Sequence, residues 1–237
     1  MTKAISTVPD RPGSIDDDRR RDPLPSAVPR RSLEGIDWKT YESMIVNPAD
    51  RRDRIAYDRG LVEIMSPSYE HEIILEWIAR LIGIVAVECD RPMRSAGSTT
   101  WRRADLQKGI EPDKCFYFKN EPVVRGKKTI DLSVDSPPDL AIEIEIEFSN
   151  PLLDRIAIYS AIGVPEIWIW RDGAISFRRL QDDATYRLID RSECLPLLTP
   201  GEVAAALASI AEVGETAWAK SIRIWAAERR SAGYDRA

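Results

Sequence analysis

The chain alternates isoleucine and glutamate without interruption from Ile142 to Glu147, within the stretch PPDLAIEIEIEFSNP. Successive side chains of a β-strand point to opposite faces, so this pattern predicts one strand with isoleucines on one face and glutamates on the other. In an isolated strand the glutamates would simply face water. However, the sequence continues with a helical segment and then the apolar stretch VPEIWIW, which is the pattern of a βαβ crossover. Parallel strands are usually covered on both faces, so the acids would need a partner.

The chain around this strand is long enough for one globular domain. It has 237 residues, of which 43% are hydrophobic, and we expect a domain over residues 33–230. Residues 1–32 are rich in proline and charge, which predicts a disordered tail. The expected fold class is α/β, with a mixed β-sheet, a central βαβ unit and flanking helices.

Apolar periodicity, capping residues and turn residues predict the remaining elements. Before the acidic strand they are a helix over 38–45, a hairpin of RIAYDRG and LVEIM around Asp58-Arg59-Gly60, a long helix capped by Ser66-Pro67 with the apolar stripe Ile74, Ile78, Leu81 and Val85, short strands over 93–118, and a turn-rich insertion KNEPVVRGKKT. The acidic strand is followed by a helix LLDRIAIYSAI, capped by Asn150-Pro151 and ended by Gly163. A meander of AISFRRL and TYRLID and one or two closing helices over 201–230 complete the chain.

Composition excludes several classes of protein. The three cysteines, Cys89, Cys115 and Cys194, are too few and too scattered for a disulfide framework or a zinc knuckle. No signal peptide opens the chain, and no apolar run approaches the roughly 18 residues of a membrane span, so a soluble cytoplasmic protein is expected. A net charge of -5 argues against coating nucleic acid through the overall field, although a local basic strip can still bind it.

The acidic face of the strand predicts a cation. Side chains at i and i+2 stand about 6 to 7 Å apart, so Glu143, Glu145 and Glu147 would repel one another without one. Magnesium prefers oxygen ligands and commonly takes only one or two protein carboxylates, with water and phosphate oxygens in its other positions. Asp113, in Glu111-Pro112-Asp113 before another strand, is a candidate second ligand.

An acid after proline on one strand and an acid on the next resemble the PD-(D/E)XK nuclease superfamily, in which Asp and (Asp/Glu)-X-Lys hold the catalytic metal. The chain is more closely similar to the Uma-type family of bacterial proteins described as restriction endonucleases. The similarity spans roughly residues 36–230 and rests on the order and spacing of LVEIMSPSYEHE, GIEPDKCFYF, PPDLAIEIE and LDRIAIYSAIGVPEIW. This resemblance implies a restriction-endonuclease-like fold and a DNA endonuclease that depends on Mg²⁺ or Mn²⁺.

The resemblance assigns roles by position. Asp113 matches the aspartate of the PD element and Glu143 the acid of the second element, so both are expected to hold the metal. Glu145 stands where the superfamily has lysine, and it is expected to ligate the metal or position water instead. Arg155, one helical turn before Tyr159, is a candidate replacement for the lysine. Because arginine cannot readily act as a base, it would either stabilise charge in the transition state or merely neutralise Glu143 or Glu145.

His71 is the only histidine of the chain. It is expected near the start of the long helix on its inward side, with Glu70 beside it. A histidine there is most often a hydrogen-bonded boundary residue, and the alternative is a catalytic acid or base. Glu70 would either extend the acidic cluster or act as a first-turn acid favoured by the helix dipole. Asp139 shares the parity of Glu143 but lies two strand steps away, so it is interpreted first as a residue of the strand start.

Basic residues near the candidate site predict where nucleic acid would lie. Arg102, Arg103 and Lys108 precede the PD element with Trp101 among them, and Arg94, Arg125, Lys127 and Lys128 are further candidates. The expected partner is DNA, and a homodimer would allow a cut through both strands. Two alternatives stay open: a nuclease-fold module that has lost catalysis and only binds DNA or a protein, and an enzyme that acts on other phosphoesters.

Overall fold

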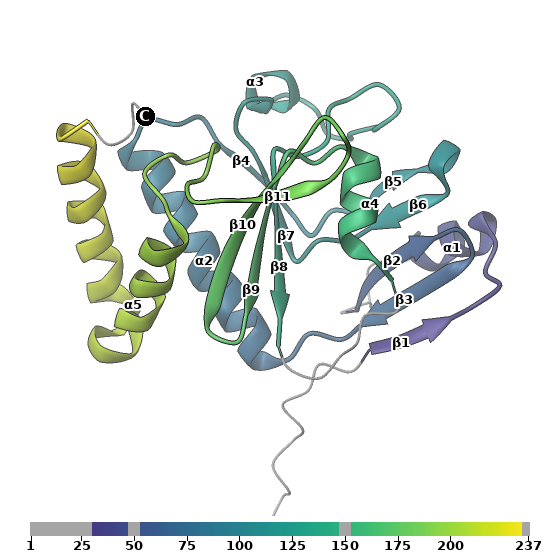
Figure 1. Ribbon diagram of the computed structural model, residues 1–237, viewed down its shortest axis with the longest axis horizontal. Helices are drawn as coiled ribbons and strands as arrows, with labels where there is room; N and C mark the ends of the chain where they lie inside the picture. The colour runs from purple at the N-terminus through teal and green to yellow at the C-terminus, as the bar shows by residue number, and fades with distance from the viewer. Residues whose placement is uncertain (1–29, 47–52, 147–152, 234–237) are drawn as a thin grey trace, which may run out of the picture.

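The protein is described here by a computed structural model that covers residues 30–46, 53–146 and 153–233. Within these ranges the chain forms two β-sheets, which are packed together with helices around them (Figure 1). One sheet is five-stranded and antiparallel, and the other is six-stranded and mixed. The α/β class and the mixed sheet were predicted, whereas the second sheet was not.

The antiparallel sheet is built around the predicted hairpin. Its order is β1, β3, β2, β6, β5, with bounds Arg30–Leu33, Leu61–Met65, Arg54–Asp58, Lys108–Ile110 and Trp101–Arg103. At the hairpin turn, Arg59 and Gly60 both have positive φ, 44° and 96°, which is the backbone form that two-residue hairpins require. Helix α1, Trp38–Ile45 as predicted, packs on this sheet through stacked Tyr41 and Tyr57. Residues 30–32, which we had assigned to the tail, belong to β1 because they pair with β3.

The mixed sheet contains the predicted βαβ unit. Its order is β11, β10, β9, β8, β7, β4, with bounds Tyr186–Ile189, Ala174–Leu180, Glu166–Arg171, Leu140–Glu145, Lys114–Tyr117 and Arg94–Gly97. Strands β8 and β9 are parallel and are joined through α4, Arg155–Ile162. Gly163 ends this helix with φ 87°, as predicted. The N-cap is Asp154, whose side chain accepts the N–H of Ala157, while Asn150-Pro151 lies outside the described residues.

Two long helices cover one face of the mixed sheet. Helix α2, Tyr69–Glu88, and helix α5, Pro200–Ser231, pack side by side against it (Figure 1). The N-cap of α2 is Ser68 and not the predicted Ser66-Pro67, because its hydroxyl accepts the N–H of His71. The backbone of α5 is non-helical at Gly214, where φ is 73° and ψ is 156°, so α5 consists of two helical segments joined there (Figure 1), in agreement with the predicted one or two closing helices. None of the helices in the described ranges is long and apolar enough to cross a membrane.

The other face of the mixed sheet packs on α4 and the antiparallel sheet. Ile142 and Ile144 of β8 point into the core under α2 and α5, and Ala141 points into a second core that includes Ile158 of α4. Burial of each isoleucine contributes about 1.5–3 kcal/mol. Since β8 is covered on both sides, Glu143 is buried, 4% exposed, and the simple solvated-strand interpretation is wrong at this position. The remaining connections include a 3-10 turn, Ala104–Leu106, and the short helix α3, Glu121–Val124.

Candidate active site

Asp113 and Glu143 lie on the same side of the mixed sheet. Strands β7 and β8 pair Lys114 with Ile142 and Cys115 with Ala141, so one further step of this antiparallel register sets Asp113 opposite Glu143. Asp113 Oδ2 accepts the backbone N–H of Ile144 at 2.8 Å, which fixes the aspartate against β8. The two side chains are 1% and 4% exposed. Two carboxyl groups from neighbouring strands therefore share one buried site.

Helix α4 supplies two partners of Glu143 from successive turns. Arg155 Nη2 and Nε lie 2.8 and 3.1 Å from Glu143 Oε1 and Oε2, a bidentate pair. The Tyr159 hydroxyl also donates to Glu143 Oε1. The spacing of four residues places both groups on one face of the helix, as the sequence predicted. Of the two interpretations of Arg155, the ion pair with Glu143 is present in the structure.

Arg155 also joins the two sheets. Its Nη2 donates to the Glu111 carbonyl at 3.0 Å, and its Nη1 lies 3.7 Å from Glu63 Oε1. Glu63, in β3, is 2% exposed and also pairs with Arg30 of β1 at 2.8 Å. Glu63 was not predicted as a residue of this site. Its signal was one acid within the otherwise apolar strand LVEIM, where alternation alone would have placed it in solvent.

His71 is fully buried and pairs with Asp113. Its Nε2 lies 3.0 Å from Asp113 Oδ2, and its Nδ1 lies 3.5 Å from Glu72 Oε1. The Ser68 N-cap fixes the first turn of α2, and this orients the imidazole toward β7. Glu70, expected beside His71 on the inward side, is instead exposed.

The cluster perturbs the protonation of its members in opposite directions. Burial acts to raise the pKa of Asp113, but the bond and charge of His71, with the charge of Arg155, hold this pKa below its ordinary value. Burial acts to lower the pKa of His71, and the carboxylates around it outweigh burial and raise this pKa. Burial raises the pKa of Glu143, aided by the charge of Asp113 and opposed by Arg155. The opposite shifts in the pKa of Asp113 and of His71 both favour the charged forms of the two groups.

We name Glu63, His71, Asp113, Glu143, Arg155 and Tyr159 the β8 cluster. Its three carboxyl groups lie beside Arg155, His71 and Arg30, so basic side chains of the chain itself face the buried acids. Burial of unbalanced charge would be strongly unfavourable.

Glu145 does not join the β8 cluster. It is the last residue of β8, its side chain is 27% exposed, and its carboxylate pairs with Arg171 of β9. Within the described ranges, no group of three or more acidic, histidine or cysteine side chains is arranged to enclose a metal ion. The expected set of Asp113, Glu143 and Glu145 around one ion is therefore not present in the structure, and Glu147 lies outside the described residues.

A cation held by fewer carboxylates does fit the β8 cluster. Asp113 Oδ1 and Glu63 Oε2 are buried, and neither has a hydrogen-bond partner in the part of the chain described here. Unpaired carboxylate oxygens in a buried site are suited to a hard divalent cation, and magnesium commonly takes only one or two protein carboxylates.

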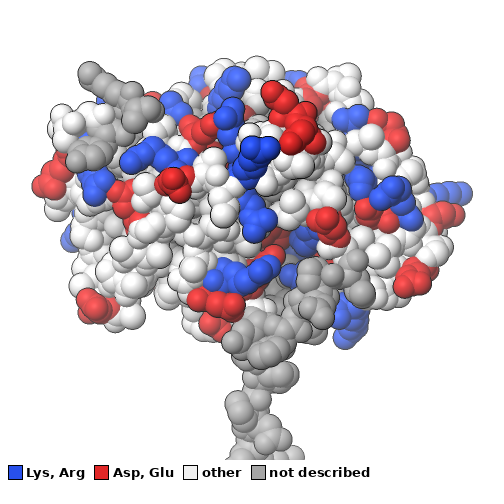
Figure 2. Space-filling model, in the orientation of Figure 1, with Lys and Arg blue, Asp and Glu red and all other residues white. Residues whose placement is uncertain are grey.

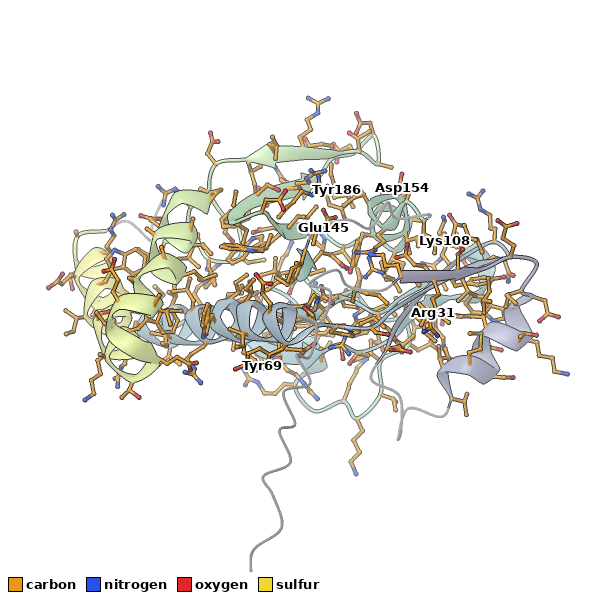
Figure 3. All side chains as sticks on the ribbon, turned by 90° about the horizontal axis from the view of Figure 1, so that it is seen from below. Arg31, Tyr69, Lys108, Glu145, Asp154 and Tyr186 are labelled. Atoms are coloured by element: carbon orange, nitrogen blue, oxygen red, sulfur yellow. The ribbon has the colours of Figure 1, made fainter. Side chains whose placement is uncertain are left out.

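The predicted nucleic-acid residues lie in or beside the antiparallel sheet and are paired with acids. Arg103 makes two bonds to Asp105, at 2.8 and 2.6 Å, and Lys108 lies 2.7 Å from Asp58. Arg102 is more loosely placed, 3.7 Å from Glu42. Lys108 and Glu145 occupy separate parts of the molecule in Figure 3. Arg94 donates to carbonyls at the end of α3 and just after it. The side chains of Arg125 and Lys127 pair with Glu121 and Asp135.

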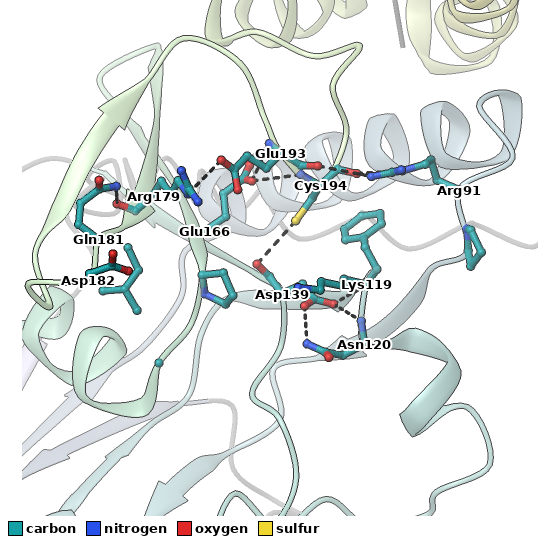
Figure 4. A pocket seen from close by; sticks show the side chains of 15 residues that line it. Arg91, Lys119, Asn120, Asp139, Glu166, Arg179, Gln181, Asp182, Glu193 and Cys194 are labelled. Carbon is teal, nitrogen blue, oxygen red and sulfur yellow. Dashed lines mark hydrogen bonds and ion pairs between the residues drawn. The ribbon is translucent and has the colours of Figure 1, made fainter. Parts of the chain in front are cut away.

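A cavity of about 620 Å³ opens at the other end of β8 and β9 (Figure 4). Asp139 and Glu166 line it, beside Arg179, Glu193 and Cys194. Asp139 accepts the N–H groups of Phe118 and Asn120 at 2.7 and 2.9 Å, and so ties the segment after β7 to the start of β8. This confirms the interpretation of Asp139 as a residue of the strand start.

A family model described as "Uma2: Putative restriction endonuclease" matches residues 38–210. A crystal structure described as "a putative nuclease belonging to DUF820", from Anabaena variabilis ATCC 29413, is similar with a TM-score of 0.42 and 15% sequence identity, over 73% of this chain and 90% of that chain. At that level of similarity it carries no argument about chemistry. None of the curated proteins matches the chain.

Proposed function

This chain belongs to the Uma2 family, and from that membership and the β8 cluster we propose that it is a metal-dependent nuclease that hydrolyses phosphodiester bonds of DNA. The observation that carries the proposal is the pair of buried carboxylates, Asp113 and Glu143, set opposite each other on neighbouring strands beside a buried arginine. The resemblance noted in the sequence places the acids of a PD-(D/E)XK site at these two positions.

Asp113 and Glu143 would hold a Mg²⁺ or Mn²⁺ ion, and the free oxygen of Glu63 is available to the same cluster. Such an ion, when bound, polarises a scissile phosphate and lowers the pKa of a water molecule. Asp113 is suited to this role because His71 keeps it ionised. Glu145 is not retained as a ligand, because it lies at the partly exposed end of β8, outside the β8 cluster.

Arg155 takes the electrostatic role of the lysine that the superfamily motif has at position 145. Its guanidinium stays protonated at any working pH, so it cannot take a proton from water. It is instead placed to stabilise negative charge that develops on a phosphate beside Glu143. His71 orients Asp113, and any proton it exchanges would pass at Nε2, the nitrogen that faces the aspartate.

Plasmid cleavage tests the proposal. Purified protein is incubated with supercoiled DNA and Mg²⁺, Mn²⁺ or EDTA, beside the variants Asp113→Asn and Glu143→Gln. We expect nicking that needs the ion and is lost in both variants, whereas Glu145→Gln, a matched change on the same strand, retains it. Cleavage that persists in EDTA, or in both cluster variants, would contradict the proposal.

One observation favours the alternative of a module that binds without cleaving. The β8 cluster is closed and neutralised by its own cations, with Asp113, Glu143 and His71 each less than 5% exposed. A descendant of the nuclease fold that had lost the motif lysine would keep such a cluster only for stability. DNA affinity without cleavage under any metal condition would favour this alternative.

A homodimer remains part of the nuclease proposal, since a two-strand cut needs two sites. Light scattering with and without duplex DNA tests for this homodimer.

A further inference from the structure

Arg178, in β10, is half-buried and lacks an acceptor. Its Nε is buried without a hydrogen-bond partner, and no ion pair or hydrogen bond of its side chain occurs within the described residues. Arg155 of the β8 cluster and Arg30 beside the cluster differ, because both contact carboxylates. A guanidinium carries five N–H donors, and withdrawing donors from water without an acceptor is unfavourable. This position is therefore suited to an anion that comes from outside the chain.

The register of the mixed sheet places Arg178 on the same face as the candidate site. Arg178 pairs with Ile167, and Ile167 with Ala141. The next row on that face runs Ser176, Ile169 and Glu143. Arg178 lies two strands from Glu143 across the sheet and two residues away along the strand direction. Together these offsets put the backbones of the two residues about 12 Å apart. Arg178 thus extends from the face that carries Glu143, two strands away.

This part of the face is open to solvent. Helix α4 covers β8 and β9, but Leu188 of β11, which pairs with Arg178, is 71% exposed. Arg171 shares the face, and its side chain is 64% exposed although it pairs with Glu145. Figure 2 shows Lys and Arg side chains running down the middle of the viewed face, where Figure 1 draws β11 and β10.

We propose that Arg178 binds a backbone phosphate of the nucleic acid whose scissile bond lies at the β8 cluster. The proposal rests on the nuclease function proposed above. A guanidinium binds phosphate bidentately, and a DNA strand carries one phosphate per roughly 3.4 Å of helix axis. A separation of about 12 Å places the phosphate bound by Arg178 a few nucleotides from the scissile phosphate. Arg178 would set the position of the strand on the sheet without reading its sequence.

Binding, measured apart from cleavage, tests this role. Fluorescence anisotropy of a labelled duplex is recorded in EDTA at several salt concentrations for the wild type, Arg178→Gln, Arg178→Lys and Arg179→Ala. Arg179 is the matched control, because it is the next residue of β10, points to the opposite face and pairs with Glu193 at 2.9 Å. We expect Arg178→Gln to weaken binding about tenfold and to reduce the slope of log K against log salt by about 0.9. Arg178→Lys should recover part of the affinity, and Arg179→Ala should bind as the wild type does.

Thermal unfolding distinguishes a loss of DNA binding from a loss of folding in Arg178→Gln. Removal of an unpaired, half-buried charge should leave the Tm of this variant unchanged or raise it. Equal affinity of the wild type and Arg178→Gln, or an equal loss in Arg179→Ala, would overturn the role of Arg178 and leave the nuclease proposal standing. No binding of duplex or single-stranded DNA by the wild type would overturn both.

Discussion

At each end of β8 lie two buried acids, one of which is the aspartate of a Pro-Asp dipeptide, yet the partners of the acids differ in kind between the two ends. At the start of the strand, Asp139 accepts bonds from two backbone N–H groups and the Asn120 amide. Glu166 beside it accepts the Trp168 indole N–H at 2.6 Å and the backbone N–H groups of Glu193 and Cys194 at 2.9 and 3.2 Å. All of these donors are neutral and fixed, and neither carboxylate has an unpaired buried oxygen in the described chain.

At the other end, Asp113 and Glu143 are partnered by ionisable side chains, in addition to the backbone N–H of Ile144 that Asp113 accepts. His71, Arg155 and Tyr159 surround them, and Asp113 keeps one oxygen without a partner. Neutral fixed donors make a buried acid a structural cross-link. Charged partners and a free oxygen instead leave the acid able to exchange a partner for a ligand, which is what a site needs. Substitution of the partners at each end of β8 tests whether the two pairs of acids differ in this way.

Removal of a partner should cost most at the β8 cluster. Arg155→Ala leaves Glu143 buried without its cation, which should lower the free energy of unfolding by about 3–5 kcal/mol. The matched change at the other end, Asn120→Ala, removes one neutral donor of Asp139 and should cost about 1–3 kcal/mol. Urea unfolding at pH 7 measures both. Equal losses would mean that the cluster is held together like the strand start and that the distinction fails.

The next largest effect is expected on DNA cleavage, which should depend on the aspartate of Pro112-Asp113 and not on that of Pro138-Asp139. Asp113→Asn should reduce the rate of DNA cleavage by about 10²–10³-fold, by analogy with the loss of one electrostatic group from an active site. Asp139→Asn should leave the rate per folded molecule within a few-fold of the wild type, because Asp139 contacts only structural donors. Single-turnover cleavage with Mn²⁺ gives the rates, and circular dichroism gives the folded fraction of each variant. A comparable loss in Asp139→Asn would place the chemistry at the wrong end of the strand.

A metal ion should stabilise the protein through one end only. At tenfold excess over its Kd, an ion that binds only the folded protein adds about 1.4 kcal/mol. We expect Mg²⁺ or Mn²⁺ to raise the Tm of the wild type and of Asp139→Asn, and to leave Asp113→Asn unchanged. A thermal scan against metal concentration measures this without any cleavage. An equal shift in Asp113→Asn would place the ion outside the β8 cluster.

Local sequence signals were sufficient for most of the fold. Gly163 at a helix end and the apolar strand EIWIW predicted the parallel pair β8 and β9, because caps and strand composition act over a few residues. The second sheet was missed because β1 and β6 join it by pairing with segments distant in sequence, residues 30–33 with 62–65 and residues 108–110 with 56–58. A four-residue strand at the edge of a tail carries no periodicity that would reveal it.

The candidate site was predictable where spacing decides it. Alternation and the Pro-Asp dipeptide pointed to Glu143 and Asp113 before the family resemblance assigned their roles. Arg155 was chosen through the resemblance, and its four-residue spacing from Tyr159 put both on one face of the helix. Alternation correctly placed Glu145 on the same face of the sheet as Glu143. It did not indicate that burial of this face ends before Glu145, the last residue of β8, which pairs with Arg171. Glu63 was hidden because its burial depends on the packing of one sheet against the other, which no local pattern records.

The smallest expected effect is the pH dependence of the His71 pair. The folded pKa of His71 is raised, so its pairing with Asp113 contributes stability that is fully present below the unfolded pKa of about 6.5 and is lost as pH rises through the folded pKa. The stability difference between the wild type and His71→Gln should therefore be largest near pH 6 and shrink toward pH 9. At the start of β8, where no histidine contacts the acids, Asn120→Ala should show a constant difference over the same range. Urea unfolding at several pH values measures both, and a His71 difference that grew with pH would mean that the imidazole is buried neutral.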